Sequence, residues 1–139
     1  KVIETGKHSN TGERLKKVKK YINNTFCLTY GDGLSNINLY NLIKFHKNNR
    51  VKKFVEKPQL KKGWINGGFF VLNKKIFKYI KNDSTMWEKE PLENLAKDNE
   101  LTGYKHKDFW YCMDTIRDKR HLNSLWFEKK APWKIWKDE

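Results

Sequence analysis

The sequence has no long hydrophobic run. No stretch approaches the roughly 20 apolar residues that a helix needs to cross a bilayer, and residues 1–4 do not have the pattern of a signal peptide. We therefore expect a cytoplasmic protein with no membrane partner. Cysteine is also scarce, because Cys27 and Cys112 are too few and too far apart for a disulfide scaffold or a zinc site. Both lie in apolar stretches, which predicts two buried free thiols.

Acidic residues are few compared with basic ones. The 139 residues include 16 Asp and Glu against 30 Lys and Arg, a formal net charge of +14, and only four of the cations are arginine. The lysines are spread over the whole chain, whereas proteins that bind nucleic acid gather their charge on one face or in one segment. We therefore expect a solvated basic surface and no nucleic-acid partner. A non-catalytic basic module for RNA or another acidic polymer is the alternative from a different class.

Neither a Ser/His/Asp order nor a Walker-type Gly-rich loop ending in Lys-Ser/Thr occurs in the sequence. What is present is an alternation of strand and helix patterns. Strands are predicted over 2–4, 26–30, 51–55, 65–72, 101–105 and 109–113, and helices over 11–22, 39–46, 76–80, 87–97 and 116–126. This order and the length of the chain favour one α/β domain with a mixed sheet.

Two acids follow apolar strands. Asp32 lies between two glycines after the predicted strand 26–30, and Asp114 follows the predicted strand 109–113, just before a helix. Open α/β sheets bind ligands at the carboxyl ends of their strands. The acids are 82 positions apart, so only a fold that joins the two strand ends makes them a pair suited to Mg²⁺. A plain turn at Asp32 and a helix cap at Asp114 are the alternatives.

Two further motifs lie at or within predicted strands. Glu56-Lys57 closes the strand 51–55, where a carboxylate can accept sugar hydroxyls and an ammonium can meet a phosphate. An exposed ion pair before a turn explains the same residues. Asn66-Gly67-Gly68 lies within the predicted strand 65–72, and paired glycines weaken a strand unless something approaches the backbone there.

Three other residues are candidates for substrate contact. Arg14 lies in the first turn of a predicted helix, where an anion is favoured. Glu88 follows Trp87 and Trp110 follows Phe109, and each of these pairs can line a sugar. A solvated arginine and an aromatic core are the alternative interpretations.

The motifs together resemble a known family, the sugar nucleotidyltransferases. They are Thr11-Gly12-Glu13-Arg14-Leu15-Lys16-Lys17-Val18, Thr29-Tyr30-Gly31-Asp32-Gly33, Glu56-Lys57-Pro58, 65–73 and 87–92. Residues 109–118 and the Trp-rich tail 130–136 resemble most closely the glucose-1-phosphate cytidylyltransferase branch of that family. The resemblance implies a Rossmann-like nucleotidyltransferase fold, a mixed sheet flanked by helices, that is incomplete in this chain. It also implies that residues 1–139 form the C-terminal, sugar- and metal-binding portion of a single domain.

The resemblance implies a reaction as well. CTP and α-D-glucose 1-phosphate would give CDP-glucose and diphosphate by Mg²⁺-dependent in-line transfer, on the path to dideoxysugars of bacterial O-antigen lipopolysaccharide. Asp32 and Asp114 would hold the metal, and Arg14 and Lys57 would complete the catalytic set. The implied substrate-binding residues are Arg14, Gly31, Glu56, Lys57, Asn66, Gly67, Gly68, Glu88 and Trp110.

The sequence departs from the family pattern in two places. The family begins with a strand and a Gly-rich loop that grips the base and the triphosphate, and nothing like that loop is found here. A further strand and loop of the family have no counterpart between Arg50 and Val51. We therefore expect the 139 residues alone to lack turnover, and the family to assemble as a homo-oligomer. A thymidylyl or uridylyl enzyme is the alternative within the family.

Overall fold

The computed structural model describes residues 1–46 and 63–137. Its helices and strands alternate along the chain, which confirms the predicted α/β class. They are α1 (Thr11–Val18), the 3₁₀ helix η1 (Lys19–Tyr21), β1 (Thr25–Thr29), β2 (Gly33–Ser35), α2 (Leu39–Phe45), β3 (Phe69–Asn73), the 3₁₀ helix η2 (Lys74–Tyr79), α3 (Glu90–Lys97), β4 (Trp110–Cys112) and α4 (Ile116–Phe127).

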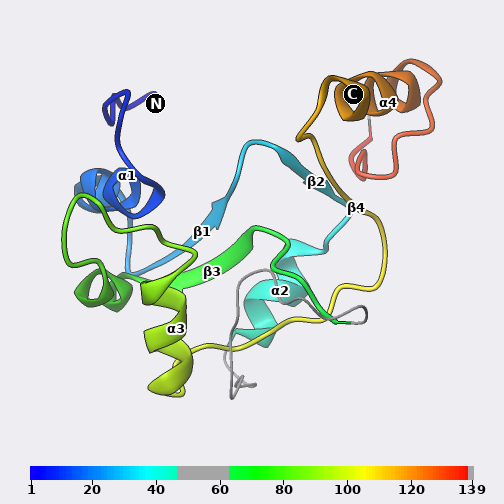
Figure 1. Cartoon of the computed structure of the whole chain (residues 1–139). Coiled ribbons are helices and arrows are strands. Elements are labelled where there is room, and N and C mark those ends of the chain that lie inside the picture. Colours follow the sequence, from blue (N-terminus) through cyan, green and yellow to red (C-terminus); the bar gives the residue numbers. More distant parts are fainter. Residues whose placement is uncertain (47–62, 138–139) are drawn as a thin grey trace.

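The strands form two antiparallel pairs (Figure 1). β1 pairs with β3 in a register that runs from Thr25 opposite Asn73 to Thr29 opposite Phe69. β2 pairs with β4, with Gly33 opposite Cys112. Within the described ranges, therefore, every strand pairing is antiparallel. The chain passes from the first pair to the second through a short turn at Gly31 and Asp32, which lies between β1 and β2.

The core gathers beside the β1–β3 pair. α1, η2 and α3 lie around this pair, whereas α4 lies apart, next to the β2–β4 pair (Figure 1). Trp87 and Leu92 are among the most deeply buried side chains, at 1% and 0% exposed. The full core cluster is Leu15, Leu72, Ile76, Phe77, Tyr79, Ile80, Trp87, Leu92 and Leu95. Burying large apolar side chains of this kind supplies most of the stability of a small domain.

Two predicted strands are absent from the described residues. The stretches 2–4 and 101–105 have no regular secondary structure, and Val2 is 98% exposed. The predicted strand 51–55 lies outside the described residues. The strand predicted over 65–72 begins only at Phe69, after the paired glycines, and β2 was not predicted.

The helix predictions hold with changed bounds. The helix expected over 87–97 begins at Glu90, with Pro91 in its first turn, where the missing N–H group of proline costs nothing. In place of the helix predicted over 76–80, residues 74–79 form a 3₁₀ helix, and Ile80 is its C-cap. The prediction of two buried thiols was wrong, since Cys27 is exposed and Cys112 is half-buried. Cys27 occupies an outward position of β1, whose burial alternates along the strand.

Candidate functional site

Antiparallel pairing of β2 with β4 brings the backbones of the two predicted acids together. The N–H group of Met113 donates to the carbonyl of Asp32 at 2.8 Å, one step beyond the Gly33–Cys112 pair. Asp114 follows directly, and both acids are exposed. The sequence alone placed them 82 positions apart, so the β2–β4 pairing is the feature that makes them neighbours.

The two carboxylates fit Mg²⁺ better than a metal that needs a full set of protein ligands. No cluster of three or more His, Cys, Asp or Glu suited to a metal occurs in the described ranges. Mg²⁺ is commonly held by one or two carboxylates and takes its remaining ligands from water and substrate phosphates. The donors at Asp32 and Asp114 match that pattern in number and in kind.

The carboxylate of Asp114 accepts a hydrogen bond from a neighbouring thiol. The thiol of Cys112 donates to Asp114 Oδ2 at 3.2 Å. This hydrogen bond, together with burial, raises the pKa of the Cys112 thiol, because the carboxylate favours the protonated form. Cys112 therefore stays a neutral donor to Asp114 at neutral pH.

The start of α4 lies directly after Asp114 and is fixed by a capping box. The hydroxyl of Thr115 accepts from the N–H group of Asp118, whose carboxylate accepts from the N–H group of Thr115 at 2.8 Å. The hydroxyl of Thr115 also donates to this carboxylate at 2.7 Å, and this bond together with the bond from the Thr115 N–H group lowers the pKa of Asp118. The helix cap expected at Asp114 thus belongs to Thr115, which leaves the Asp114 carboxylate outside the capping box.

The predicted glycine motif forms a tight turn before β3. The N–H group of Gly68 donates to Asn66 Oδ1 at 2.9 Å. Gly68 has a φ of +74°, and a Cβ there would lie 2.7 Å from the ring of Tyr30. Trp110 Nε1 donates to the carbonyl of Gly67 at 2.8 Å. The turn therefore brings Asn66, Gly67, Gly68 and Trp110 together.

A cavity of about 1160 Å³ lies beside this turn. Asn66, Gly67 and Trp110 contribute to its lining, together with Ser35 and His106. His106 Nε2 lies 3.1 Å from Ser35 Oγ and 3.0 Å from the carbonyl of Phe109. Ligand pockets usually enclose about 300–1000 Å³, so the space is ample for a sugar phosphate.

Glu88 and Arg14 lie near the N-terminus of α1 but bond to different segments. The carboxylate of Glu88 accepts from Tyr30 Oη at 2.5 Å and from Thr11 Oγ1 at 2.7 Å. The guanidinium of Arg14 donates to the segment 5–9, through Nε to the carbonyl of Ser9 at 2.9 Å, and also to Thr5 and Lys7. Arg14 thus ties down the loop before α1.

The remaining predicted site residues are Gly31, Glu56 and Lys57. Gly31 is exposed in the turn that carries Asp32, and a Cβ there would have no neighbour within 4 Å. Glu56 and Lys57 lie outside the described residues. The sequence analysis did not single out Tyr30 as a site residue. The available signal was its position at the end of a predicted strand, directly before the Gly-Asp-Gly turn.

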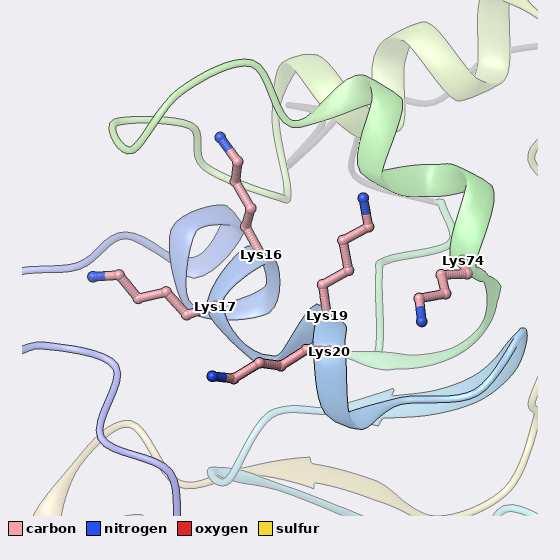
Figure 2. Close-up of a pocket in the computed structure, with 5 residues that line it drawn as sticks. All are labelled: Lys16, Lys17, Lys19, Lys20 and Lys74. Carbon is pink, nitrogen blue, oxygen red and sulfur yellow. The ribbon is translucent and has the colours of Figure 1, made fainter.

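A shallow hollow of about 310 Å³ is lined by lysines alone, and Figure 2 shows that their side chains point in different directions. The five residues are Lys16, Lys17, Lys19, Lys20 and Lys74. Lys17 forms an ion pair with Glu13, Lys74 donates to a backbone carbonyl at 3.0 Å, and Lys19 lies over the ring of Phe77. Because these ammonium groups diverge and several are already bonded, the hollow does not form a convergent anion site.

Comparison with known proteins places this arrangement in a family. The model of the nucleotidyl transferase family matches residues 8–138. The chain belongs to the nucleotidyl transferase family. Within this nucleotidyl transferase chain the match covers both acids, the glycine turn, Glu88 and Trp110.

Individual relatives act on sugar phosphates, according to their names. Glucose-1-phosphate cytidylyltransferase of Salmonella typhimurium is 41% identical over 160 residues, which cover 97% of this chain and 62% of that protein. A probable glucose-1-phosphate cytidylyltransferase of Bacillus subtilis is 41% identical over 159 residues, 96% of this chain and 62% of the relative. Mannose-1-phosphate guanylyltransferase 1 of Arabidopsis thaliana is 36% identical over 92 residues, 62% of this chain and 25% of the relative.

The chain is shorter than the cytidylyltransferases it matches. It spans 62% of the length of the Salmonella typhimurium protein. The matched stretch of 160 positions also exceeds the 139 residues of this chain, so at least 21 of those positions have no counterpart here. No helix among the described residues is long and apolar enough to span a membrane.

Proposed function

We propose that this chain provides the sugar-phosphate and metal part of a glucose-1-phosphate cytidylyltransferase. The enzyme would join CTP and α-D-glucose 1-phosphate to give CDP-glucose and diphosphate, in the cytoplasm, as a homo-oligomer, on the path to dideoxysugars of O-antigen lipopolysaccharide. The 41% identity over 97% of the chain to a protein of that name carries the proposal. The neighbouring positions of Asp32 and Asp114 support it.

Asp32 and Asp114 would hold Mg²⁺. Their carboxylates are exposed at one junction, and the Cys112 hydrogen bond helps to orient Asp114. When bound, Mg²⁺ offsets the charge that develops on the phosphoryl oxygens. The remaining contribution of this chain is the positioning of the attacking phosphate oxygen, which accounts for much of the rate in reactions of this class.

The glycine turn and Trp110 would bind the sugar. Gly67 lets the indole of Trp110 lie against the backbone, where the hydrogen bond from Trp110 Nε1 keeps it, and Gly68 lets the ring of Tyr30 pack against the same turn. Lys57 would meet the sugar phosphate as a point charge, Glu56 would accept a sugar hydroxyl, and Arg14 would face the nucleotide. These roles follow from the family resemblance of their motifs.

Two measurements test the proposal, the first for the sugar phosphate and the second for the nucleotide. Titration calorimetry of the 139-residue chain with Mg²⁺ should give saturable binding of glucose 1-phosphate and weaker binding of mannose 1-phosphate and inorganic phosphate. Asn66→Ala should weaken binding of glucose 1-phosphate several-fold. Binding that favours mannose 1-phosphate would contradict the proposal and point to the guanylyltransferase relatives.

Turnover is measured separately as diphosphate release. CTP, GTP, dTTP and UTP are each supplied with glucose 1-phosphate and Mg²⁺. We expect no release by the 139-residue chain, and release that is fastest with CTP by a longer protein that contains it. Preference for dTTP or UTP would refute the cytidylyl assignment while leaving the nucleotidyl transfer intact.

A further inference from the structure

The carboxylate of Glu88 connects two segments that are far apart in the sequence. Its two oxygens accept separate hydrogen bonds, from Tyr30 Oη at 2.5 Å and from Thr11 Oγ1 at 2.7 Å. Hydrogen bonds to a charged carboxylate are shorter and stronger than neutral ones. Glu88 therefore joins the first residue of α1 to the end of the segment that contains β1.

The Thr11 end of this connection is itself fixed. The hydroxyl of Thr11 accepts from the N–H group of Trp87 at 2.9 Å, and the N–H group of Gly12 donates to the carbonyl of Thr85 at 3.1 Å. Trp87 is almost fully buried. The backbone on which Glu88 stands is thus held against α1, so that its carboxylate has a defined position.

Tyr30, at the other end of this connection, adjoins two parts of the candidate site. Tyr30 directly precedes Gly31 and Asp32 in the chain, and its ring covers Gly68, where a Cβ would lie 2.7 Å from Cδ2 of the ring. The ring also meets Phe70 edge to face, with centroids 5.9 Å apart. A movement of this ring would therefore shift both the turn of Asp32 and the turn of Gly68.

We infer that Tyr30 and Glu88 form a positioning pair that sets the metal-binding turn at Asp32 against the sugar-binding turn at Asn66–Gly68. The inference rests on the proposed function, because it assigns those turns to metal and sugar. In this arrangement Glu88 acts on the substrate through Tyr30 and is a positioning residue, which differs from the direct sugar contact that the resemblance implied. The phenol hydroxyl carries the coupling, since it is the group that Glu88 holds.

The test uses two substitutions that remove single groups. Tyr30→Phe keeps the ring over Gly68 and loses the hydroxyl, and Glu88→Gln keeps the shape of the side chain and loses the charge. The matched control is Asp98→Asn, because Asp98 Oδ2 accepts from Tyr79 Oη at 2.6 Å in a similar tyrosine–carboxylate bond and Asp98 is not among the residues that line the cavity. No candidate site residue takes part in that bond. Near-UV circular dichroism establishes that each variant is folded at the measuring temperature.

The first readout is the Kd for glucose 1-phosphate, measured with Mg²⁺ well below the unfolding temperature. We expect Tyr30→Phe and Glu88→Gln each to weaken binding at least fivefold, the double variant to weaken it no more than the stronger single one, and Asp98→Asn to stay within twofold. A purely structural role would lower the unfolding temperature of all three variants and leave their Kd values equal. Unchanged binding in Tyr30→Phe would overturn the inference.

The second readout needs no ligand. Hydrogen–deuterium exchange should rise at least fivefold at 31–33 and 66–68 in both site variants, whereas in Asp98→Asn it should rise only near the end of α3. Equal exchange at the two turns in wild type and variants would refute the positioning pair. If the wild-type chain binds no glucose 1-phosphate, the proposed function fails, and the exchange data still decide whether the pair couples the two turns.

Discussion

Replacing Gly68 by alanine tests how tightly the sugar-binding turn is built. The φ of +74° at Gly68 is a conformation that an L-residue adopts at a cost of about 1–2 kcal/mol. The new Cβ would also lie 2.7 Å from Cδ2 of Tyr30, closer than van der Waals contact allows. Because Glu88 and Phe70 hold that ring, relieving the overlap should cost about 1–3 kcal/mol more.

The free energy of unfolding of Gly68→Ala should therefore fall by about 2–5 kcal/mol. With an m-value of about 2 kcal/mol/M, the urea midpoint falls by about 1–2.5 M. The assay is urea unfolding followed by tryptophan fluorescence. Gly31→Ala is the control, since its Cβ would have no neighbour within 4 Å and its φ is not in the left-handed range.

Two outcomes would refute this reasoning. Gly68→Ala with the stability of the wild type would mean that the turn relaxes freely, and an equal loss in Gly31→Ala would mean that any side chain in these turns is destabilising. Gly68→Asn separates the two costs, because asparagine tolerates a positive φ yet still meets Tyr30. We expect it to lose less stability than Gly68→Ala if backbone strain dominates.

Three further predictions concern the core, a thiol and a helix cap. Leu92→Ala should lower the free energy of unfolding by about 2–5 kcal/mol in thermal or urea unfolding, because the side chain is fully buried; a loss under 1 kcal/mol would contradict that burial. A thiol reagent should label exposed Cys27 faster than Cys112, whose pKa is raised, and Asp114→Asn should speed the labelling of Cys112 alone. The pKa of Asp118 in the folded chain is lowered from its usual value of 3.8. The ionised carboxylate therefore stabilises α4 fully above pH 3.8, and this stabilisation is lost as the pH falls through the lower folded-state pKa. Helicity measured by circular dichroism should fall over this acidic range in the wild type. Asp118→Asn should have reduced helicity already at neutral pH, and its helicity should change less as the pH falls.

Periodicity and turn chemistry predicted the helices well, but not always for the right local reason. Asn10 with Glu13 three residues later has the pattern of a capping box, which is typical of a helix start and agrees with the helix predicted over 11–22. α1 does begin at Thr11, yet the Asn10 side chain makes no capping bond and donates to the carbonyl of Ser84 instead. Glu13 pairs with Lys17. Tertiary contacts with the segment 82–88 have replaced the local cap, and no local pattern reveals such contacts.

The candidate site was predictable in part. The strand-end positions of Asp32 and Asp114 singled out both acids, but their proximity depends on β2, a three-residue strand too short to have a period of its own. The Tyr30–Glu88 contact joins residues 58 positions apart. Each contact of this kind requires the fold to be known, so the sequence supplied the residue types and the structure supplied their neighbours.

The pairing of β2 with β4 also bears on how the length of such a chain can vary. Residues 33–35 meet 110–112, so forming this junction closes a loop of roughly 75 residues, at an entropic cost of about 4 kcal/mol. That cost grows only with the logarithm of loop length. If all of the at least 21 additional matched positions of the Salmonella typhimurium relative lay inside the loop, closing it would cost only about 0.2 kcal/mol more. Segments can thus be gained or lost between the two acids during evolution with little effect on the stability of their junction.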